Sequence, residues 1–385
     1  MTSQAVQLVE VCDVVMGQSP PSSTYNDSGD GLPFFQGKVD FGDRYPRTRV
    51  FCSKPVRIAE QGDILISVRA PVGPTNLVRE KCCIGRGLAA LRPRKRLRND
   101  YLLYFLRHRE PQLAYLGQGS TFGAINREVL EELNIPLPPE HEQHRIADKL
   151  EWVDRLRRTR RYAVELSDIF LPAAFLELFG DLRQNHHHWP FVELETHAEI
   201  VSGVAKGQKY GDRETVEVPY LRVANVQDGY LDLSEIKIIR ALPADVESLR
   251  LKAGDVVMTE GGDFDKLGRG AIWPGSIVNC IHQNHIFRVR LDKAILLPTF
   301  FAAFLRSAVS KDYFLRCSKQ TTNLASINMT QLRATPVPLP PLVRQQHFSK
   351  LVTRHEHSRA NQREALRQTD HLFQTVLHQA FDLNR

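Results

Sequence analysis

The second half of the chain repeats the first, and this duplication limits the possible folds more than any other feature. The segment INREVLEELNIPLP at 125–138 matches INMTQLRATPVPLP at 327–340, each position 202 residues later. The same offset continues past the prolines, where Gln143 aligns with Gln345. The offset falls to 186 at Pro33, so the second copy has gained residues between its conserved runs. Self-similarity at so long a period predicts two copies of one structural unit.

Each copy has the same internal order. Short apolar runs such as DILISV and DVVMTE are broken by Gly and Pro turns, a pattern typical of β-rich domains. An amphipathic helical stretch follows at 100–108 and at 299–307, and then a proline-rich segment, IPLPPE or VPLPPL, which a helix cannot cross. We therefore expect each copy to be a β-rich head that ends in a proline elbow.

Beyond each elbow, apolar residues recur at steps of four and three, which is the spacing of one face of a helix. The pattern predicts two helices of about 40 residues, each about 60 Å long. Their apolar stripes can be buried on each other. Pro172 lies inside the first helix and is expected to kink or divide it. The stripe residues that we select for helix packing and partner binding are Ile146, Leu150, Val153, Phe348, Val352 and Phe373.

These patterns predict an α+β chain with a pseudo-twofold internal repeat. The expected boundaries are 1–139 for the first head, 140–185 for the first long helix, 186–341 for the second head and 342–385 for the second long helix.

Composition limits the class of protein further. The 385 residues exceed what one core usually supports, and the net charge of +7 suits a polyanionic partner. The six cysteines show no C-x-x-C pair, so we expect reduced, mostly buried thiols rather than zinc ligands or disulfides. The start of the chain lacks a signal-peptide pattern and no apolar window is long enough for a membrane span, which predicts an intracellular protein.

The repeated unit of head, elbow and long helix resembles the specificity (S) subunit of type I restriction-modification systems over nearly the whole chain. The resemblance depends on GQSPPSSTYN, LPFFQGKVDFGDRYP, GDILISVRAPVG, GRGLAAL, GQGSTFGAINREVL and IPLPPEHEQHRIADKL in the first copy, and on GDVVMTEGGDFDKLGRGAIW, INMTQL and PLPPLVRQQHFSKL in the second. The polar stretch at 359–362, which interrupts the stripe of the second helix, is a departure from the pattern.

The resemblance implies a function and a set of partners. Each head would be a target-recognition domain that reads one half of a split site in double-stranded DNA. The helices would form an antiparallel coiled-coil spacer that docks two methyltransferase (M) subunits, with restriction/motor (R) subunits joining through the complex in a prokaryotic cytoplasm. A non-DNA scaffold, with heads that bind proteins, is the alternative, and salt-sensitive DNA binding separates the two.

Recognition of DNA needs cations for phosphates and forked polar side chains for base edges, and the loops between strands must supply them. For each single residue, a role in the protein surface is as plausible as a DNA contact. The candidates in the first head are Gln36, Lys38, Arg69, Arg86, Gln118, Ser120 and Thr121, and those in the second are Arg222, Asn225, Lys266, Arg269, Gln283 and Asn284. The arginine-dense runs at 92–98 and 155–161 could contact phosphates or an acidic partner, or could simply be solvated.

The sequence gives no basis for catalysis by the chain itself. No cofactor loop with an Asn/Asp-Pro-Pro-Tyr/Phe motif, Walker A loop, G-x-S-x-G or H-E-x-x-H is present. The segment GGDFDKLGRG lacks the G-K-[ST] ending of a phosphate loop, and Pro274 stands where a calcium loop needs Glu. We expect no cofactor and no metal, and we interpret the histidines at 186–188 as a solvated linker.

Overall fold

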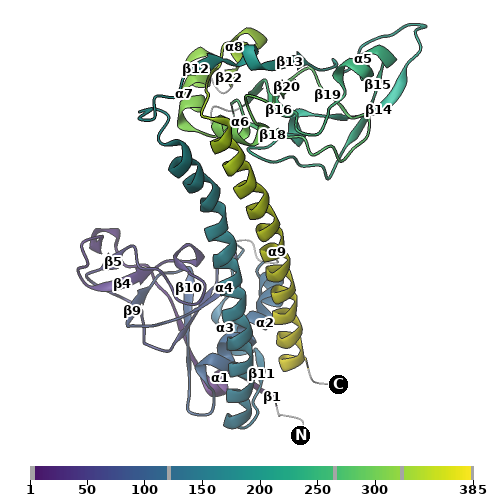
Figure 1. The fold of residues 1–385 in the computed structure, drawn as a ribbon. Helices are drawn as coiled ribbons and strands as arrows, with labels where there is room; N and C mark the ends of the chain where they lie inside the picture. Colours follow the sequence, from purple (N-terminus) through teal and green to yellow (C-terminus); the bar gives the residue numbers. More distant parts are fainter. Residues whose placement is uncertain (1–4, 119–122, 263–266, 321–324, 383–385) are drawn as a thin grey trace. The chain divides into compact units, whose positions relative to one another are not determined.

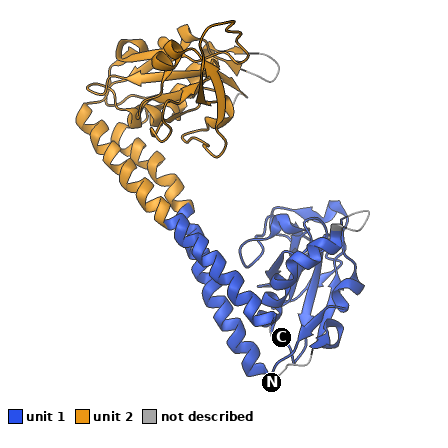
Figure 2. Ribbon diagram, turned by 90° about the vertical axis from the view of Figure 1, so that its right-hand side faces the viewer, with its two compact units in different colours: residues 1–164, 362–385 blue, residues 165–361 orange. Residues whose placement is uncertain are grey.

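The computed structural model describes residues 5–118, 123–262, 267–320 and 325–382. The chain divides into two compact units (Figure 2). Unit 1 comprises residues 1–164 and 362–385, and unit 2 comprises residues 165–361. Each unit contains a β-rich head and a part of both long helices.

The head of unit 1 is built on two sheets. One is antiparallel, with strand order β2 (Cys12–Met16), β10 (Leu88–Pro93), β7 (Ile64–Ser67) and β8 (Thr75–Leu77). The other has the order β3 (Tyr25–Asn26), β5 (Phe51–Cys52), β4 (Leu32–Phe35), β9 (Cys82–Ile84) and β6 (Ile58–Ala59). Helix α2 (Asn99–Gln118) packs on the first sheet, where Leu102 and Phe105 join Ile64 and Leu91 in one core.

The head of unit 2 repeats this plan. Its antiparallel sheet has the order β13 (Ala198–Ser202), β20 (Ile286–Leu291), β16 (Val256–Thr259) and β18 (Gly270–Ile272). A three-stranded sheet has the order β15 (Lys237–Ala241), β14 (Val216–Leu221) and β19 (Ile281–His282). Helices α6 (Pro298–Leu305) and α7 (Ala308–Cys317) stand in the place of α2, and α5 (Pro243–Leu249) follows β15. A small sheet of β17 (Gly261–Gly262), β22 (Ala325–Ser326) and β21 (Lys319–Gln320) completes the head.

Each proline elbow is anchored by a short antiparallel pair of strands. In unit 1 the strand β1 (Ala5–Gln7) pairs with β11 (Asn134–Pro136), and in unit 2 β12 (Phe191–Glu193) pairs with β23 (Pro336–Pro338). A short helix precedes each elbow, α3 (Arg127–Glu131) or α8 (Met329–Arg333). Their N-caps are Asn126 and Asn328, whose side chains accept a hydrogen bond from the third residue of the helix. These residues are 202 positions apart, so the sequence repeat is also a repeat of local structure. Helix α1 (Leu8–Val11) follows β1.

The two long helices, α4 (Glu140–Phe179) and α9 (Leu342–Phe381), have 40 residues each and begin directly after the elbows. In both units α4 and α9 lie side by side (Figure 1). In unit 1, Leu150 and Val153 share a core with Phe373. In unit 2, the rings of Phe175 and Phe348 are 5.5 Å apart.

Pro172 does not divide α4, which corrects that part of the expectation. Its ring is exposed, and the turns on either side of it are fixed to α9 within unit 2. On one side Ser167 lies 2.9 Å from the Nε2 of His355, and on the other Phe175 packs on Phe348. Packing on both sides offsets the hydrogen bond that a proline removes from the helix.

The stripe residues chosen from the sequence are buried within the chain. Leu150, Val153, Phe348 and Phe373 are at most 2% exposed. Ile146 and Val352 are partly buried against the same cores. A partner could therefore reach these helices only through their other faces. Along the described part of the chain, none of the helices combines the length and the apolar character needed to cross a membrane.

Candidate nucleic-acid interface

In unit 1 the predicted contact residues gather where two parallel strands end. Strand β4 pairs with β9 in parallel, with Phe35 opposite Ile84. Parallel strands end at the same edge of a sheet, so the segment 36–38 lies beside the segment 85–87. Gln36, Lys38 and Arg86 are all exposed at this edge.

Glycines let the backbones meet closely at this edge. A Cβ added to Gly87 would lie 2.3 Å from the carbonyl oxygen of Gln36, and one added to Gly17 would lie 2.2 Å from that of Gly85. Both distances are too short for any other residue type. The glycines of the GRG and GQS motifs therefore fix the backbone on which Arg86 and Gln18 are presented.

Arg69 joins the same edge from the neighbouring sheet. The amide of Val68 donates to the carbonyl of Gly87 at 3.0 Å, and Arg69 forms a bridge with Ala124. The side chains of Arg69 and Arg86 are exposed, and within the described ranges neither forms an ion pair. Two uncompensated guanidinium groups at one edge provide an anion-binding surface.

Gln18 is a residue of this edge that the sequence analysis did not select. Its amide donates to Ile84 at 3.1 Å, its side chain is exposed, and the hydroxyl of the adjacent Ser19 accepts from the amide of Arg86 at 3.3 Å. The GQSPPSST motif was the available signal. Ser120, Thr121 and Lys266 lie outside the described residues, as does the side chain of Gln118.

Unit 2 has an equivalent edge. Strand β14 pairs with β19 in parallel, with Leu221 opposite His282, and the amide of Gln283 donates to Leu221 at 2.9 Å. A Cβ on Gly203 would lie 1.8 Å from the carbonyl oxygen of His282, so Gly203 has the role that Gly17 has in unit 1. Gln283 and Asn284 are half-buried at this edge.

Two candidates of the second head stabilise a loop of the protein. Asn225 is 3% exposed, and its side chain donates to the carbonyls of Asp232 and Glu235 and accepts from the amide of Arg222. The guanidinium of Arg222 donates to the carboxylate of Glu235 at 2.9 Å, which holds the pKa of that carboxyl below its usual value. We leave Asn225 out of the interface because its side chain is already occupied.

Arg269 lies half-buried beside another loop of the same head. Its guanidinium donates to the side-chain oxygen of Gln227 at 3.2 Å, while its buried Nε has no hydrogen-bond partner among the described residues. Since part of its guanidinium has no hydrogen-bond partner among the described residues, Arg269 is kept as a candidate for DNA binding.

The loop 205–215 of unit 2 carries cations that the sequence analysis missed. It follows Val204, which forms a bridge with Gln283 at the parallel edge. Lys206, Lys209 and Arg213 are exposed on it. The density of cations in VAKGQKYGDRE was the signal, and the loop comes after Gly203 as QSPPSST comes after Gly17 in the first copy.

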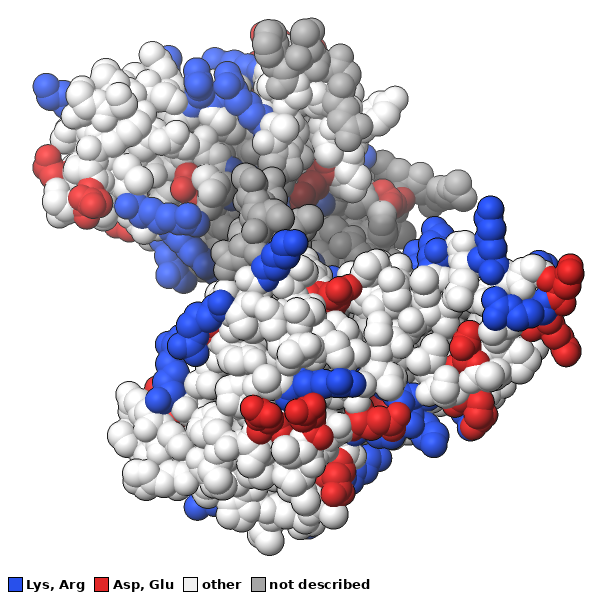
Figure 3. Space-filling model, turned by 90° about the horizontal axis from the view of Figure 1, so that it is seen from above, with Lys and Arg blue, Asp and Glu red and all other residues white. Residues whose placement is uncertain are grey.

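The arginine-dense runs are mainly engaged within the chain. In the run at 92–98, Arg92 pairs with Asp63 at 2.8 Å, Arg94 with Asp13 at 2.5 Å and Arg98 with Asp100 at 3.0 Å. In the run at 155–161, three arginines pair with carboxylates of unit 1: Arg157, Arg158 and Arg161. On the face drawn in Figure 3, cationic and acidic side chains are interspersed. This face therefore has no broad patch of one charge sign among its described residues.

Comparison with known proteins identifies the family of the chain. The model of the type I restriction modification DNA specificity domain matches residues 2–166 and 187–367. The chain therefore belongs to the family of type I restriction-modification DNA specificity domains.

Individual relatives carry related names. The chain is 47% identical over 149 residues to the putative type I restriction enzyme MjaX specificity subunit of Methanocaldococcus jannaschii, a match to 38% of this chain and 35% of that protein. It thus spans about a third of that relative. It is 20% identical over 372 residues to the MjaIX specificity subunit of the same organism, covering 90% of this chain and 85% of the relative.

A solved structure has the same fold along nearly the whole chain. The type I restriction-modification S subunit from M. genitalium matches with a TM-score of 0.60 and 16% identity, covering 98% of this chain and 96% of that one.

Proposed function

We propose that this chain is the DNA sequence-recognition subunit of a type I restriction-modification complex, in which each head reads one half of a bipartite site. The observation that carries the proposal is the repeated edge. In both heads two parallel strands end beside a glycine whose backbone closely approaches another strand end, Gly17 or Gly203, and present polar loops. Backbone amides and exposed cations at such an edge hold phosphates, while Gln and Arg forks read base edges.

The long helices would set the distance between the half-sites. Within each unit α4 and α9 run antiparallel. In unit 2, Ser167 contacts His355, whereas Phe175, further along α4, contacts Phe348, which comes before His355 in α9. We infer that the two helices form an antiparallel coiled-coil spacer between a first head at 1–139 and a second at 186–341. A rod of fixed length between two readers specifies both spacing and rotational phase on the duplex.

The chemistry would be supplied by partners. We infer that the chain itself is not catalytic and that two methyltransferase subunits dock on the helices, with restriction subunits joining through the complex in the cytoplasm. In both units α4 carries exposed apolar side chains, with Trp152 58% and Tyr162 61% exposed in unit 1 and Ile169 63% exposed in unit 2. Exposed aromatic and apolar side chains on a helix fit a protein partner.

The scaffold alternative is not favoured, because the family is defined by DNA specificity. The test is to assemble the chain with a type I methyltransferase subunit that forms a complex with it and to measure binding to a pool of duplex DNA at several salt concentrations. If the chain reads DNA, the logarithm of the binding constant should fall linearly with the logarithm of the salt concentration. The complex should also enrich one split motif from the pool. Assembly of the complex with neither property would instead support the scaffold.

A further inference from the structure

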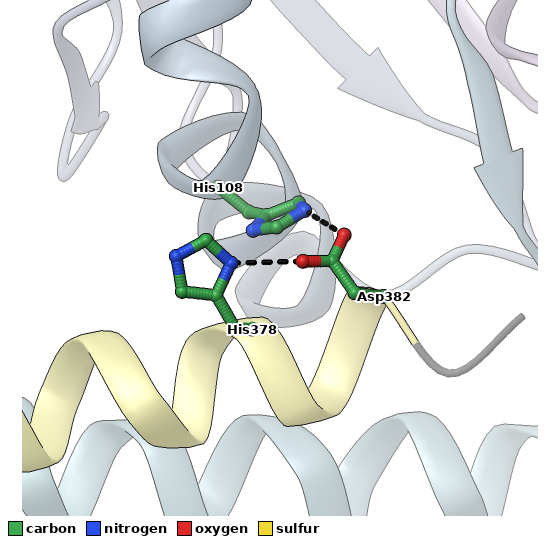
Figure 4. Close-up of side chains that lie close together, drawn as sticks. All are labelled: His108, His378 and Asp382. Atoms are coloured by element: carbon green, nitrogen blue, oxygen red, sulfur yellow. Dashed lines mark hydrogen bonds and ion pairs between the residues drawn. The ribbon is translucent and has the colours of Figure 1, made fainter. Parts of the chain in front are cut away.

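Two histidines and one aspartate converge at the C-terminal end of α9 in unit 1 (Figure 4). The Nε2 of His108, on α2, lies 2.9 Å from one carboxylate oxygen of Asp382, and the Nδ1 of His378 lies 2.8 Å from the other. The three ligand atoms lie within 4.8 Å of one another. The cluster has no part in the DNA-binding edges described above.

The arrangement is held in place by its surroundings. The side chain of His108 is 6% exposed, and its ring stacks on Phe381 at 5.6 Å. His378 and Asp382 are four residues apart, which places them on the same face of the chain's last helical turn. One nearly buried ligand from α2 thus faces two ligands from α9 whose side chains are more exposed.

The polar groups of the cluster suit a cation. Asp382 contributes a carboxylate to which both imidazoles are joined. The other ring nitrogen of His108, Nδ1, is buried and has no hydrogen-bond partner among the described residues. The C-terminal end of α9 adds the negative end of the helix dipole.

We propose that His108, His378 and Asp382 form a binding site for a divalent transition-metal ion of the zinc type. Two imidazole nitrogens and one carboxylate oxygen are a common zinc ligand set, and water would take the fourth position. Ligand atoms around a tetrahedral zinc ion are about 3.4 Å apart. The two nitrogen–oxygen contacts of 2.9 and 2.8 Å would therefore widen, and any pair of ligand atoms near the 4.8 Å limit would have to move closer. A neutral imidazole would bind the metal through its unprotonated ring nitrogen and carry its N–H on the other nitrogen, so it releases no proton, whereas a protonated imidazole would release one proton to solvent.

The site would fasten the end of the chain to the first head. Residues 362–385 belong to the same unit as residues 1–164, although they are distant in sequence. Here they meet α2 through Phe381, which packs on Tyr101 and Phe105. A metal ligated by both α2 and α9 would link these segments and raise the stability of the unit by mass action. This inference does not depend on the DNA-recognition proposal.

The test is titration of the full-length, untagged chain with Zn²⁺ by calorimetry, with thermal unfolding in parallel. The informative variants are D382N and H378A, because both side chains are more than half exposed and their substitution should leave the fold intact. The matched control is H144A on α4, since His144 and Asp148 form another His–Asp pair four residues apart, 3.4 Å from each other, but without a buried third ligand. To remove weak binding by the histidines at 186–188, all proteins carry alanine at these three positions.

We expect one saturable Zn²⁺ ion per chain and a zinc-dependent rise in Tm, both retained by H144A and both lost in D382N and in H378A. The proposal is overturned if the chain shows no saturable binding. It is equally overturned if D382N and H378A bind zinc and gain Tm as the H144A protein does.

Discussion

Gln345 makes in the second copy the same three hydrogen bonds that Gln143 makes in the first. Each side chain is buried, donates to two carbonyls and accepts from one amide, at distances of 2.8 to 3.0 Å. One acceptor belongs to the proline elbow, and the other two groups belong to the segment before the helix that packs on the sheet. The partners are Arg96, Arg98 and Pro138 for Gln143, and Ile295, Leu297 and Pro340 for Gln345.

Removal of either glutamine should destabilise the unit to which it belongs. Q345A removes the side-chain partner of three backbone groups, two in part-buried contacts and one in a buried contact, and we expect a loss of about 1–3 kcal/mol in the free energy of unfolding. Denaturant unfolding measures this loss. The control is Q346A, since Gln346 is the next residue of α9 and is exposed. Equal stability of the Q345A and Q346A variants would contradict the role assigned to Gln345.

The sequence repeat predicted this pairing of glutamines and the position of both long helices, because local patterns determine them. The corresponding apolar runs DILISV and DVVMTE begin with Asp63 and Asp255. The structure adds that these buried carboxylates hold Arg92 and Arg290, each through two hydrogen bonds of 2.8 to 2.9 Å. The division of the heads into separate sheets was not predictable, since strands of two to four residues are selected by non-local pairing rather than by propensity.

The candidate site was predicted only in part. Gln36 and Arg86 follow strands that are 47 residues apart, and only their parallel pairing brings them to one edge. Asn225 illustrates the opposite case. An Asn in a polar loop is a residue type that often contacts DNA. Here, however, its side chain is buried and donates to the carbonyls of Asp232 and Glu235, and the sequence alone does not show that these carbonyls lie beside it.

Asp154 should make the stability of unit 1 depend on pH. It is fully buried in α4 and pairs with three arginines, Arg107, Arg157 and Arg158. Burial alone would raise the pKa of Asp154, but these cations outweigh it and hold the pKa below its usual value. Its contribution is therefore fully present above the unfolded pKa of about 4 and is lost as the pH falls through the lower folded value.

We accordingly expect D154N to lose about 3 kcal/mol at neutral pH, because the arginines lose their buried partner. Below about pH 4 the difference from the unmodified chain should shrink. Chemical unfolding at several pH values measures both effects. D148N provides the control, as Asp148 is exposed on the same helix. A constant difference between D154N and the unmodified chain at every pH would show that charge pairing is not its cause.

Arg69 and Arg86 should contribute to DNA binding as uncompensated cations. In the complex with the methyltransferase, R69A and R86A should each weaken binding and reduce the log–log salt slope by about 1 if the arginine contacts a phosphate. If it reads a base, the cost should be about 1–3 kcal/mol at one position of the first half-site. R94A is the control, because Arg94 is exposed but paired with Asp13. A larger effect from R94A than from R69A and R86A would place the interface elsewhere.

The length of the long helices should determine the gap between the half-sites. Seven residues inserted after Val164 and seven after Asn361 lengthen both helices by about 10 Å, which corresponds to about three base pairs. The unspecified gap should grow by that amount while both half-sites keep their sequence. Seven residues inserted after His187, outside both helices, should leave the gap unchanged. A gap that stays the same when both helices are lengthened would refute the spacer role.

The most direct test of the account is long-read mapping of adenine methylation in cells that express this chain with a type I methyltransferase subunit that forms a complex with it, compared with cells that express the methyltransferase alone. We predict a split motif with an unspecified gap, methylated only when this chain is present. A stable complex that methylates no motif, or a motif that is methylated without this chain, would contradict the conclusion that its two heads read DNA.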